Sequence, residues 1–251
     1  MKKKYTTLFF DLDGTLWDLK KNTELTLREL WMESQLESQA TGDFSRFFQR
    51  YTFHNDQVWA LYRDNKIEKE VLRVARFERT FSDMNVSWSN TQILQFADQF
   101  IERCPRQPNV LPGTFEILNA CKDQFKMCLI TNGFNEVQTI KMAAAGIDHF
   151  FESIVYSEDL GIKKPHPEIF QLAMQRANCK PEDALMIGDD WDADIIGAMG
   201  VGMDQAFLGA TENQLNEIRL ADGLKPLRHN RQPTYRLESL LDLGPILNLS
   251  I

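Results

Sequence analysis

Strand-like and helix-like patterns alternate along the chain from about residue 126 onward. Short apolar runs bounded by turn residues predict strands, and stretches with an apolar residue every three or four positions predict helices. The expected strands are residues 126–131, 153–156, 184–188 and 205–208, and the expected helices are residues 136–145, 167–177 and 192–199. An apolar run at residues 5–11 predicts a buried strand that precedes all of these elements. Residues 233–243 are expected to add a final edge strand and a helix. This alternation predicts an α/β fold with a doubly wound parallel sheet and helices on both faces.

The segment from about residue 20 to residue 99 has a different pattern, with a single glycine and no proline. Its apolar residues follow helical spacing, and Phe44, Phe47, Phe48 and Tyr51 form one stripe of a helix. Prolines and a glycine between residues 105 and 113 then interrupt the chain, as a linker would. We therefore expect residues 1–18 and 101–251 to form the α/β core. Residues 19–100 are expected to form an all-helical domain inserted after the first strand, with the aromatic stripe in its core.

Composition and charge narrow the classes of partner. The 251 residues include 28 Lys and Arg against 36 Asp and Glu, a net charge of −8. An acidic chain disfavours a nucleic-acid polymer or an anionic membrane as partner, because both attract basic surfaces. No apolar run approaches the roughly 18 residues of a membrane span, and the run that follows the basic start is too short for a signal peptide.

Cysteine and histidine usage agrees with a reducing compartment. The four cysteines form no Cys-x-x-Cys pair, and the four histidines are scattered along the chain. This usage favours buried, reduced thiols over zinc sites or disulfides. We therefore expect a cytoplasmic protein, and both a monomer and a homodimer remain open.

Acidic and polar residues follow the ends of the expected strands. The first strand ends in DLDGT (11–15), the next ends in TNG (131–133), and a later one ends in GDDWDAD (188–194). The segment KKP (163–165) precedes a helix. In open parallel sheets ligands bind at the carboxyl ends of the strands, so these side chains are expected to meet at one edge.

Several carboxylates at one edge need a counter-charge. They cannot all ionise within a few ångströms of each other, and a divalent cation with oxygen ligands resolves the conflict. Mg²⁺ suits such a site because it accepts few protein carboxylates and keeps several waters. The ion and a lysine at the rim would also bind phosphate oxygens, which indicates a site that handles phosphoryl groups.

The four motifs together resemble those of the haloacid dehalogenase-like (HAD) superfamily of phosphohydrolases. These are DLDGT, a strand ending in TNG, KKPHPEIF and GDDWDAD, and the helical segment lies where that family places its first cap. The resemblance implies that Asp11 is the nucleophile that forms an aspartyl phosphate. It implies that Asp13 is the acid that protonates the leaving group and the base that later activates water. The side chains of Asp11 and Asp189 and the backbone carbonyl of Asp13 would hold Mg²⁺.

The resemblance also assigns the remaining site residues. Thr131, Asn132 and Gly133 would bind the phosphoryl group, and Lys164 would neutralise its charge, with Lys163 as the alternative lysine. The remaining two candidates, which would hold metal-bound waters or Lys164, are Asp190 and Asp194, and Asp194 is favoured.

Other sites with similar residues fit the sequence less well. A calcium-binding EF-hand loop starting at Asp11 would need a glutamate at its twelfth position, where Asn22 stands. Phosphoacceptor receiver domains are shorter, and no G-x-x-x-x-G-K-[ST] loop is present. Dehalogenases of the superfamily lack an acid at the position of Asp13, so its presence favours phosphate esters over haloacids.

The substrate is expected to be a small-molecule phosphate ester. The segment TLFFDLDGTLWDL and the stretch from LITNGFNEVQ through SEDLGIKKPHPEIF resemble the family's 5′-nucleotidase branch, which acts on pyrimidine and non-standard nucleoside monophosphates. Phosphoglycolate or sugar-phosphate hydrolysis is the alternative, and a phosphomutase or a non-catalytic binding module stay open. Trp17, just after the nucleophile loop, is a candidate wall of the leaving-group pocket.

Overall fold

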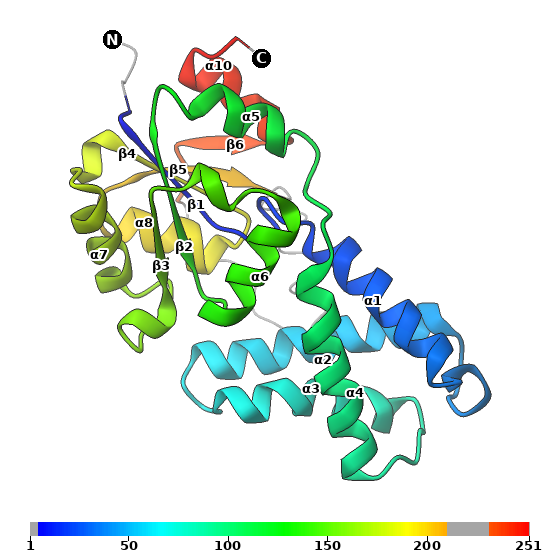
Figure 1. Cartoon of the computed structure of the whole chain (residues 1–251). Helices are drawn as coiled ribbons and strands as arrows, with labels where there is room; N and C mark the ends of the chain where they lie inside the picture. The colour runs from blue at the N-terminus through cyan, green and yellow to red at the C-terminus, as the bar shows by residue number, and fades with distance from the viewer. Residues whose placement is uncertain (1–4, 210–230, 251) are drawn as a thin grey trace. The chain divides into compact units, whose positions relative to one another are not determined.

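The computed structural model describes residues 5–209 and 231–250, and its helices and strands are labelled in Figure 1. The strands are β1 Thr7–Phe10, β2 Lys126–Thr131, β3 Ser153–Tyr156, β4 Ala184–Gly188, β5 Asp204–Leu208 and β6 Tyr235–Leu237. The α-helices are α1 Leu19–Glu33, α2 Phe44–Arg63, α3 Lys69–Asp83, α4 Asn90–Arg103, α5 Thr114–Cys121, α6 Asn135–Ala145, α7 Pro167–Ala177, α8 Gly197–Gly200 and α10 Leu243–Leu247.

The six strands form one parallel sheet in the order β3-β2-β1-β4-β5-β6. The chain moves outward from β1 through β2 to β3, and then returns to the other side of β1 for β4, β5 and β6. The direction of winding therefore reverses between β1 and β4. Such a switch point opens a crevice at the carboxyl ends of the two central strands, which is where open α/β sheets bind their ligands.

Both faces of the sheet are covered. Phe9, Ile130 and Met186 pack with α7 in one buried apolar cluster. Their neighbours along the strands point to the opposite face, because successive side chains in a strand alternate. Phe10 and Ile187, which lie on that second face, are also fully buried. The doubly wound α/β fold expected from the sequence is therefore confirmed.

The element boundaries agree with the sequence patterns over most of the sheet. The strands at 126–131, 153–156 and 184–188 and the helix at 167–177 have the expected limits, and the edge strand β6 is present. The first strand is shorter than expected and ends at Phe10, so Asp11 lies just beyond it. The expected helix at 192–199 is instead a π-helix at Trp191–Ile196 followed by the short α8. The amide of Ile195 reaches the Asp190 carbonyl at 3.4 Å, five residues back, which widens this turn.

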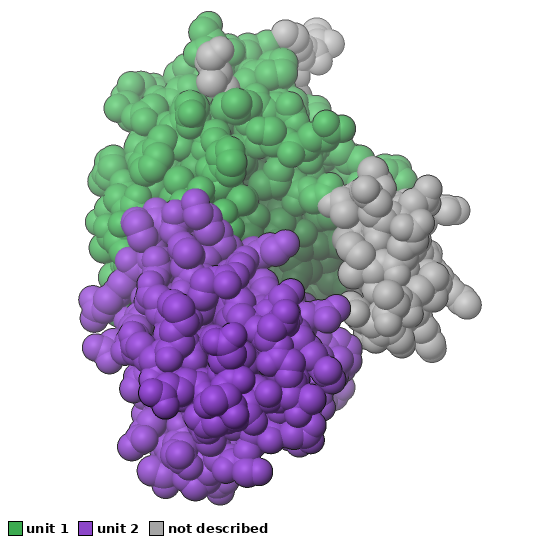
Figure 2. All heavy atoms as spheres, turned by 90° about the vertical axis from the view of Figure 1, so that its right-hand side faces the viewer, with its two compact units in different colours: residues 1–18, 110–251 green, residues 19–109 purple. Residues whose placement is uncertain are grey.

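The chain divides into two compact units, coloured separately in Figure 2. The α/β unit comprises residues 1–18 and 110–251, and the helical unit comprises Leu19–Asn109. The second boundary falls nine residues later than the expected one at 100/101. Helix α4 continues to Arg103, and the side-chain amide of Asn22 donates to the Asn109 carbonyl at 2.8 Å. These contacts attach the proline-containing stretch before Val110 to the helical unit.

Aromatic side chains fill the core of the helical unit. Of the stripe predicted for the core, Phe44, Phe47 and Tyr51 of α2 are buried, whereas Phe48 is half-buried; Phe77 of α3 is fully buried. Phe47 packs against Phe81 with ring centroids 6.0 Å apart. This aromatic cluster forms the core of a unit that has no strand among its described residues.

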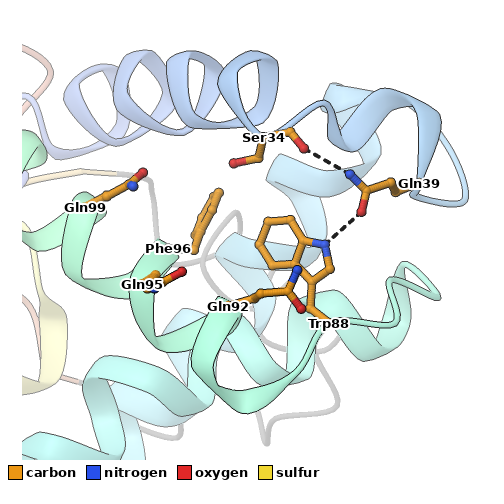
Figure 3. A pocket seen from close by; sticks show the side chains of 7 residues that line it. All are labelled: Ser34, Gln39, Trp88, Gln92, Gln95, Phe96 and Gln99. Atoms are coloured by element: carbon orange, nitrogen blue, oxygen red, sulfur yellow. Dashed lines mark hydrogen bonds between the residues drawn. The ribbon is translucent and has the colours of Figure 1, made fainter.

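One pocket lies on the helical unit, and its lining is mostly amide side chains (Figure 3). Three glutamines of α4 line it together with Trp88 and Gln39, and the Trp88 indole N–H donates to the side-chain oxygen of Gln39 at 2.8 Å. None of the acidic motif residues lines this pocket.

Three of the four cysteines, Cys104, Cys121 and Cys128, are buried, and Cys179 is half-buried. Within residues 5–209 and 231–250, no helix combines the length and the apolar character that crossing a membrane requires.

Candidate active site

Asp11 begins the candidate site at the end of β1, in the centre of the sheet. Its amide donates to the Ile187 carbonyl of β4 at 2.9 Å, which continues the strand pairing one residue past β1. The carboxylate is 8% exposed, and its Oδ1 lies 2.6 Å from the ammonium of Lys164. The backbone hydrogen bond to β4 therefore fixes the position of Asp11, and the ion pair with Lys164 fixes the direction of its side chain.

Lys164 is the lysine that enters the cluster, and three oxygens surround its ammonium. Its Nζ donates to Asp11 Oδ1 and to Asp194 Oδ1 at 2.6 Å each, and to the Ile130 carbonyl at 2.7 Å. These acceptors match the three protons of an ammonium group. The side chain is 2% exposed, so the pairs are shielded from water.

Asn132 positions the backbone of Lys164. Its side-chain NH₂ donates to the Lys164 carbonyl at 3.1 Å, and its side-chain oxygen accepts from the Lys164 amide at 2.8 Å. The Asn132 side chain, expected from the sequence to bind phosphate, is thus engaged with the lysine segment through both of its polar atoms. One N–H of the amide remains for a ligand.

Asp189 lies beside Asp11 because β1 and β4 are neighbours in register. Its Oδ1 accepts from the Thr15 hydroxyl at 2.8 Å. Gly14 has a φ of +86°, and a Cβ at this position would lie 2.3 Å from Asp189 Oδ2. Only glycine therefore allows the loop after β1 to pass so close to this carboxylate.

Asp190 and Asp194 have different roles. The Asp190 carboxylate caps the π-helix by accepting from the amides of Asp192 and Ala193 at 3.0 and 2.9 Å. Asp194 is fully buried and pairs with Lys164, and its Oδ2 accepts from the Asp190 amide at 3.1 Å. Of the two residues, Asp194 is the one that the structure brings against the lysine.

Burial and crowding change the protonation behaviour of these groups. Burial raises the pKa of Asp11 although Lys164 opposes the shift, and burial together with the charges of Asp11 and Asp194 raises that of Asp189. Burial raises the pKa of Asp194 to about 7. Burial alone would lower the pKa of Lys164, but the attraction of Asp11 and Asp194 outweighs it and the pKa is raised. The cluster therefore contains more negative charge than one ammonium compensates.

The same carboxylates fit a divalent cation. One oxygen each of Asp11, Asp189 and Asp194 lies within 4.8 Å of the others. With all three ionised, the lysine leaves two negative charges uncompensated, which is the charge that Mg²⁺ would supply. The set consists of oxygen ligands, which Mg²⁺ prefers. Asp194 uses both of its oxygens, Oδ1 on Lys164 and Oδ2 on the Asp190 amide, so Asp11 and Asp189 are better placed to hold a metal.

Asp13 points to a different group of side chains. Its Oδ1 accepts from the ammonium of Lys141 at 2.6 Å, and its Oδ2 accepts from the side-chain amide of Gln138 at 2.9 Å. Its side chain is thus outside the group of three carboxylates. Only its backbone carbonyl, the atom that the resemblance assigns to the metal, remains for that purpose.

Gln138 and Lys141, which both belong to α6, were not among the residues assigned from the sequence, although Gln138 is the last residue of the segment LITNGFNEVQ. Gln138 also donates to the Thr131 hydroxyl oxygen at 2.7 Å, and the Lys141 ammonium lies 4.5 Å from the centre of the Trp17 ring. Their spacing of three residues places them on one face of a helix. No motif marks them, and the only available signal was their position in the helix after TNG.

We next compared the sequence with models of known protein families. A model of the haloacid dehalogenase-like hydrolases matches residues 5–202, which include every motif described above. The chain belongs to the haloacid dehalogenase-like hydrolase family. It is therefore a hydrolase, as the four motifs predict.

Relatives from several bacteria match almost the whole chain. The pyrimidine 5′-nucleotidase YjjG of Escherichia coli is 28% identical over 245 residues, covering 97% of this chain and 98% of that protein. The pyrimidine 5′-nucleotidase PynA of Streptococcus pneumoniae is 27% identical over 249 residues, with 98% and 97% covered. The magnesium-bound putative HAD-hydrolase YfnB of Bacillus subtilis has a similar fold, with a TM-score of 0.81, 24% identity, and coverage of 98% and 100%.

Proposed function

We propose that this family member is a Mg²⁺-dependent phosphomonoesterase that works through an aspartyl phosphate on Asp11. Its proposed substrates are pyrimidine nucleoside 5′-monophosphates. The observation that supports the chemistry best is the meeting of Asp11, Asp189 and Asp194 around the buried Lys164. Three carboxylates and one ammonium repel an anionic ligand, so the site can bind a phosphate ester only after a cation has bound to the carboxylates.

The metal is proposed to bind Asp11, Asp189 and the backbone carbonyl of Asp13. When bound, Mg²⁺ would supply positive charge that compensates the carboxylates and the phosphoryl oxygens. Lys164 supplies the second positive charge, and its ion pair with Asp194 keeps it in place.

The protein side chains divide the reaction into two displacements. In the first, the Asp11 carboxylate attacks phosphorus, the bond from phosphorus to the leaving oxygen breaks, and Asp13 gives that oxygen a proton. In the second, Asp13 takes a proton from water, the water oxygen attacks phosphorus, and the bond to Asp11 breaks. The products are an alcohol and inorganic phosphate, and Asp11 and Asp13 return to their starting states. The Thr131 hydroxyl and the Gly133 segment are proposed to orient the phosphoryl oxygens.

The substrate assignment rests on a resemblance at two levels. The segment that begins with TNG resembles the nucleotidase branch of the family, and two relatives that match nearly the whole chain are pyrimidine 5′-nucleotidases. We assign the helical unit the role of the family's cap, which selects the substrate.

A substrate panel tests this proposal. Release of inorganic phosphate is measured from the nucleoside 5′-monophosphates, phosphoglycolate and several sugar phosphates, with Mg²⁺ and with a chelator. We expect Mg²⁺-dependent release, with kcat/KM highest for pyrimidine nucleotides. A flat profile would contradict the nucleotidase assignment, and a maximum for phosphoglycolate or a sugar phosphate would favour the alternative. No Mg²⁺-dependent release from any ester by the folded protein would contradict the phosphatase itself.

A further inference from the structure

Helix α6 places two side chains against Asp13, and neither belongs to a motif of the site. The amide nitrogen of Gln138 lies 2.9 Å from Asp13 Oδ2, and the ammonium of Lys141 lies 2.6 Å from Asp13 Oδ1. Gln138 is fully buried and Lys141 is 8% exposed. Each oxygen of the Asp13 carboxylate thus has its own donor, and the two donors come from one helix face.

The hydrogen-bond pattern fixes the orientation of the Gln138 amide. In the form of Asp13 that acts as the base, its carboxylate only accepts hydrogen bonds, so the NH₂ end of Gln138 and not its oxygen faces it. The same nitrogen donates to the Thr131 hydroxyl oxygen at 2.7 Å. Its two protons are therefore both used, one on Asp13 and one on Thr131.

This pattern also determines what the Thr131 hydroxyl can do. Its oxygen accepts from Gln138 at 2.7 Å and from the Gly133 amide at 3.1 Å. A hydroxyl oxygen has two acceptor sites and one proton, so with both sites filled the proton must point to another acceptor. Thr131 is thereby held as a donor, the state in which it can bind a phosphoryl oxygen.

The absence of a side chain on Gly133 makes room for the amide group of Gln138. A Cβ on Gly133 would lie 2.3 Å from the Gln138 nitrogen. The Gln138 oxygen, in contrast, is buried with no hydrogen-bond partner among the described residues. An unpaired buried acceptor costs free energy, so the side chain contributes less to stability than its contacts suggest.

Lys141 is fixed from the other side. Its ammonium lies 4.5 Å from the centre of the Trp17 ring, and Trp17 is fully buried. The loop that contains Asp13 is closed by the Trp17 amide, which donates to the Leu12 carbonyl at 2.8 Å. The lysine is therefore held between the ring and the carboxylate at the two ends of this loop.

The geometry points to Gln138 and Lys141 as positioning residues for the proposed acid and base, Asp13. They hold its carboxylate in the direction from which the leaving oxygen receives a proton, and Gln138 also keeps Thr131 as a donor. This inference rests on the proposed phosphatase reaction. It predicts that both residues matter most when the leaving oxygen needs a proton to depart.

Leaving-group dependence separates positioning from a structural role. The alkoxide leaving from a nucleoside 5′-monophosphate is strongly basic and needs a proton, whereas 4-nitrophenolate leaves without one. The parameter kcat/KM covers the steps up to departure of the leaving group. Both esters are compared in Mg²⁺ for wild type, Gln138→Leu, Lys141→Met and, as control on the exposed face of α6, Thr139→Ala.

We expect kcat/KM for UMP to fall by roughly 10- to 100-fold in both variants, less than the roughly 10²- to 10⁴-fold that general acid–base catalysis contributes, because Asp13 itself is still present. For 4-nitrophenyl phosphate we expect a loss of a few-fold at most in Lys141→Met and a somewhat larger one in Gln138→Leu, which also affects Thr131. The ratio of the two values should fall in both variants and stay unchanged in Thr139→Ala. A partly unfolded sample loses both activities equally, so this ratio is independent of the active fraction. The melting temperature of Gln138→Leu should fall by only a few degrees, because the variant removes an unpaired buried oxygen together with two hydrogen bonds.

Equal losses with both esters, or none, in a wild type that hydrolyses both would overturn the positioning role and leave the phosphatase standing. A wild type without activity on either ester would overturn the phosphatase and the positioning role together.

Discussion

At the residue scale, the ammonium of Lys164 provides positive charge that compensates the negative charge of the carboxylate cluster. It contacts Asp11 and Asp194 at 2.6 Å each and is almost completely buried. Removing one partner of a buried ion pair leaves an uncompensated charge in a medium of low dielectric constant. Lys164 is therefore as much a structural residue as a candidate catalytic one.

The variant Lys164→Met tests this dual role. In a metal-free buffer at neutral pH, we expect the free energy of unfolding to fall by about 3–5 kcal/mol, as for other broken buried ion pairs. The matched control is Lys163→Met, for which a loss of about 1 kcal/mol or less is expected because this lysine is less buried. Denaturant unfolding measures both. Equal losses in the two variants would show that the buried ion pairs do not stabilise the fold.

At the element scale, the sequence predicts the sheet well because each strand is a short apolar run between turn residues. The strands at 126–131, 153–156 and 184–188 and the helix that starts at Pro167 have the predicted limits. Candidate ligand residues that follow the strands can also be predicted from the sequence, because the carboxyl ends of parallel strands lie at one edge of the sheet. This explains why Asp11, Asp189 and Lys164 were found from sequence and do meet in the structure.

Three features depend on packing and have no local signal. The π-helix at Trp191–Ile196 results from the widened turn after Asp190, whereas the apolar spacing there indicates an ordinary helix. The end of the helical unit depends on hydrogen bonds between Asn22 and Asn109, which are far apart in sequence. The contacts of α6 with Asp13 depend on how that helix rests against the sheet edge, and helical spacing alone does not say which face is turned inward.

At the scale of the whole molecule, the acidic groups behind the net charge of −8 are of two kinds, those on the surface and those in the carboxylate cluster. Most acidic groups are solvated, and their charge disfavours anionic polymers. The group of Asp11, Asp189 and Asp194, in which Asp11 and Asp194 are buried and Asp189 is half-buried, is different, because loss of hydration raises the pKa of each carboxyl. These three groups connect the stability of the whole fold to pH and to metal binding.

This connection predicts how stability depends on pH without metal. A carboxyl whose pKa is raised by folding binds protons more readily in the folded state, so the free energy of unfolding falls as pH rises through the interval between the two pKa values. For Asp194 this interval extends from the unperturbed 3.8 to about 7. We therefore expect the cluster to destabilise the metal-free protein progressively from about pH 4 to pH 7.

Mg²⁺ should reverse this loss, because it binds ionised carboxylates. We expect the rise in melting temperature on adding Mg²⁺ to be small at pH 5 and larger at pH 7.5. Thermal unfolding with Mg²⁺ and with a chelator, at several pH values, measures this difference. Asp189→Asn serves as the matched variant and should respond weakly at every pH. An equal rise at pH 5 and pH 7.5, or no rise at all, would contradict a metal site formed by these carboxylates.

The central claim is that Asp11 is the nucleophile of a Mg²⁺-dependent phosphatase, and one comparison tests it most directly. Initial rates of phosphate release from UMP are measured for wild type and Asp11→Asn, each with Mg²⁺ and each with a chelator. The amide cannot attack phosphorus, so we predict a rate loss on the order of 10³-fold or more, with the variant still folded because Asp194 continues to pair with Lys164. A folded Asp11→Asn protein that keeps more than about a tenth of the wild-type rate would contradict this account, because removing a nucleophile costs far more than that.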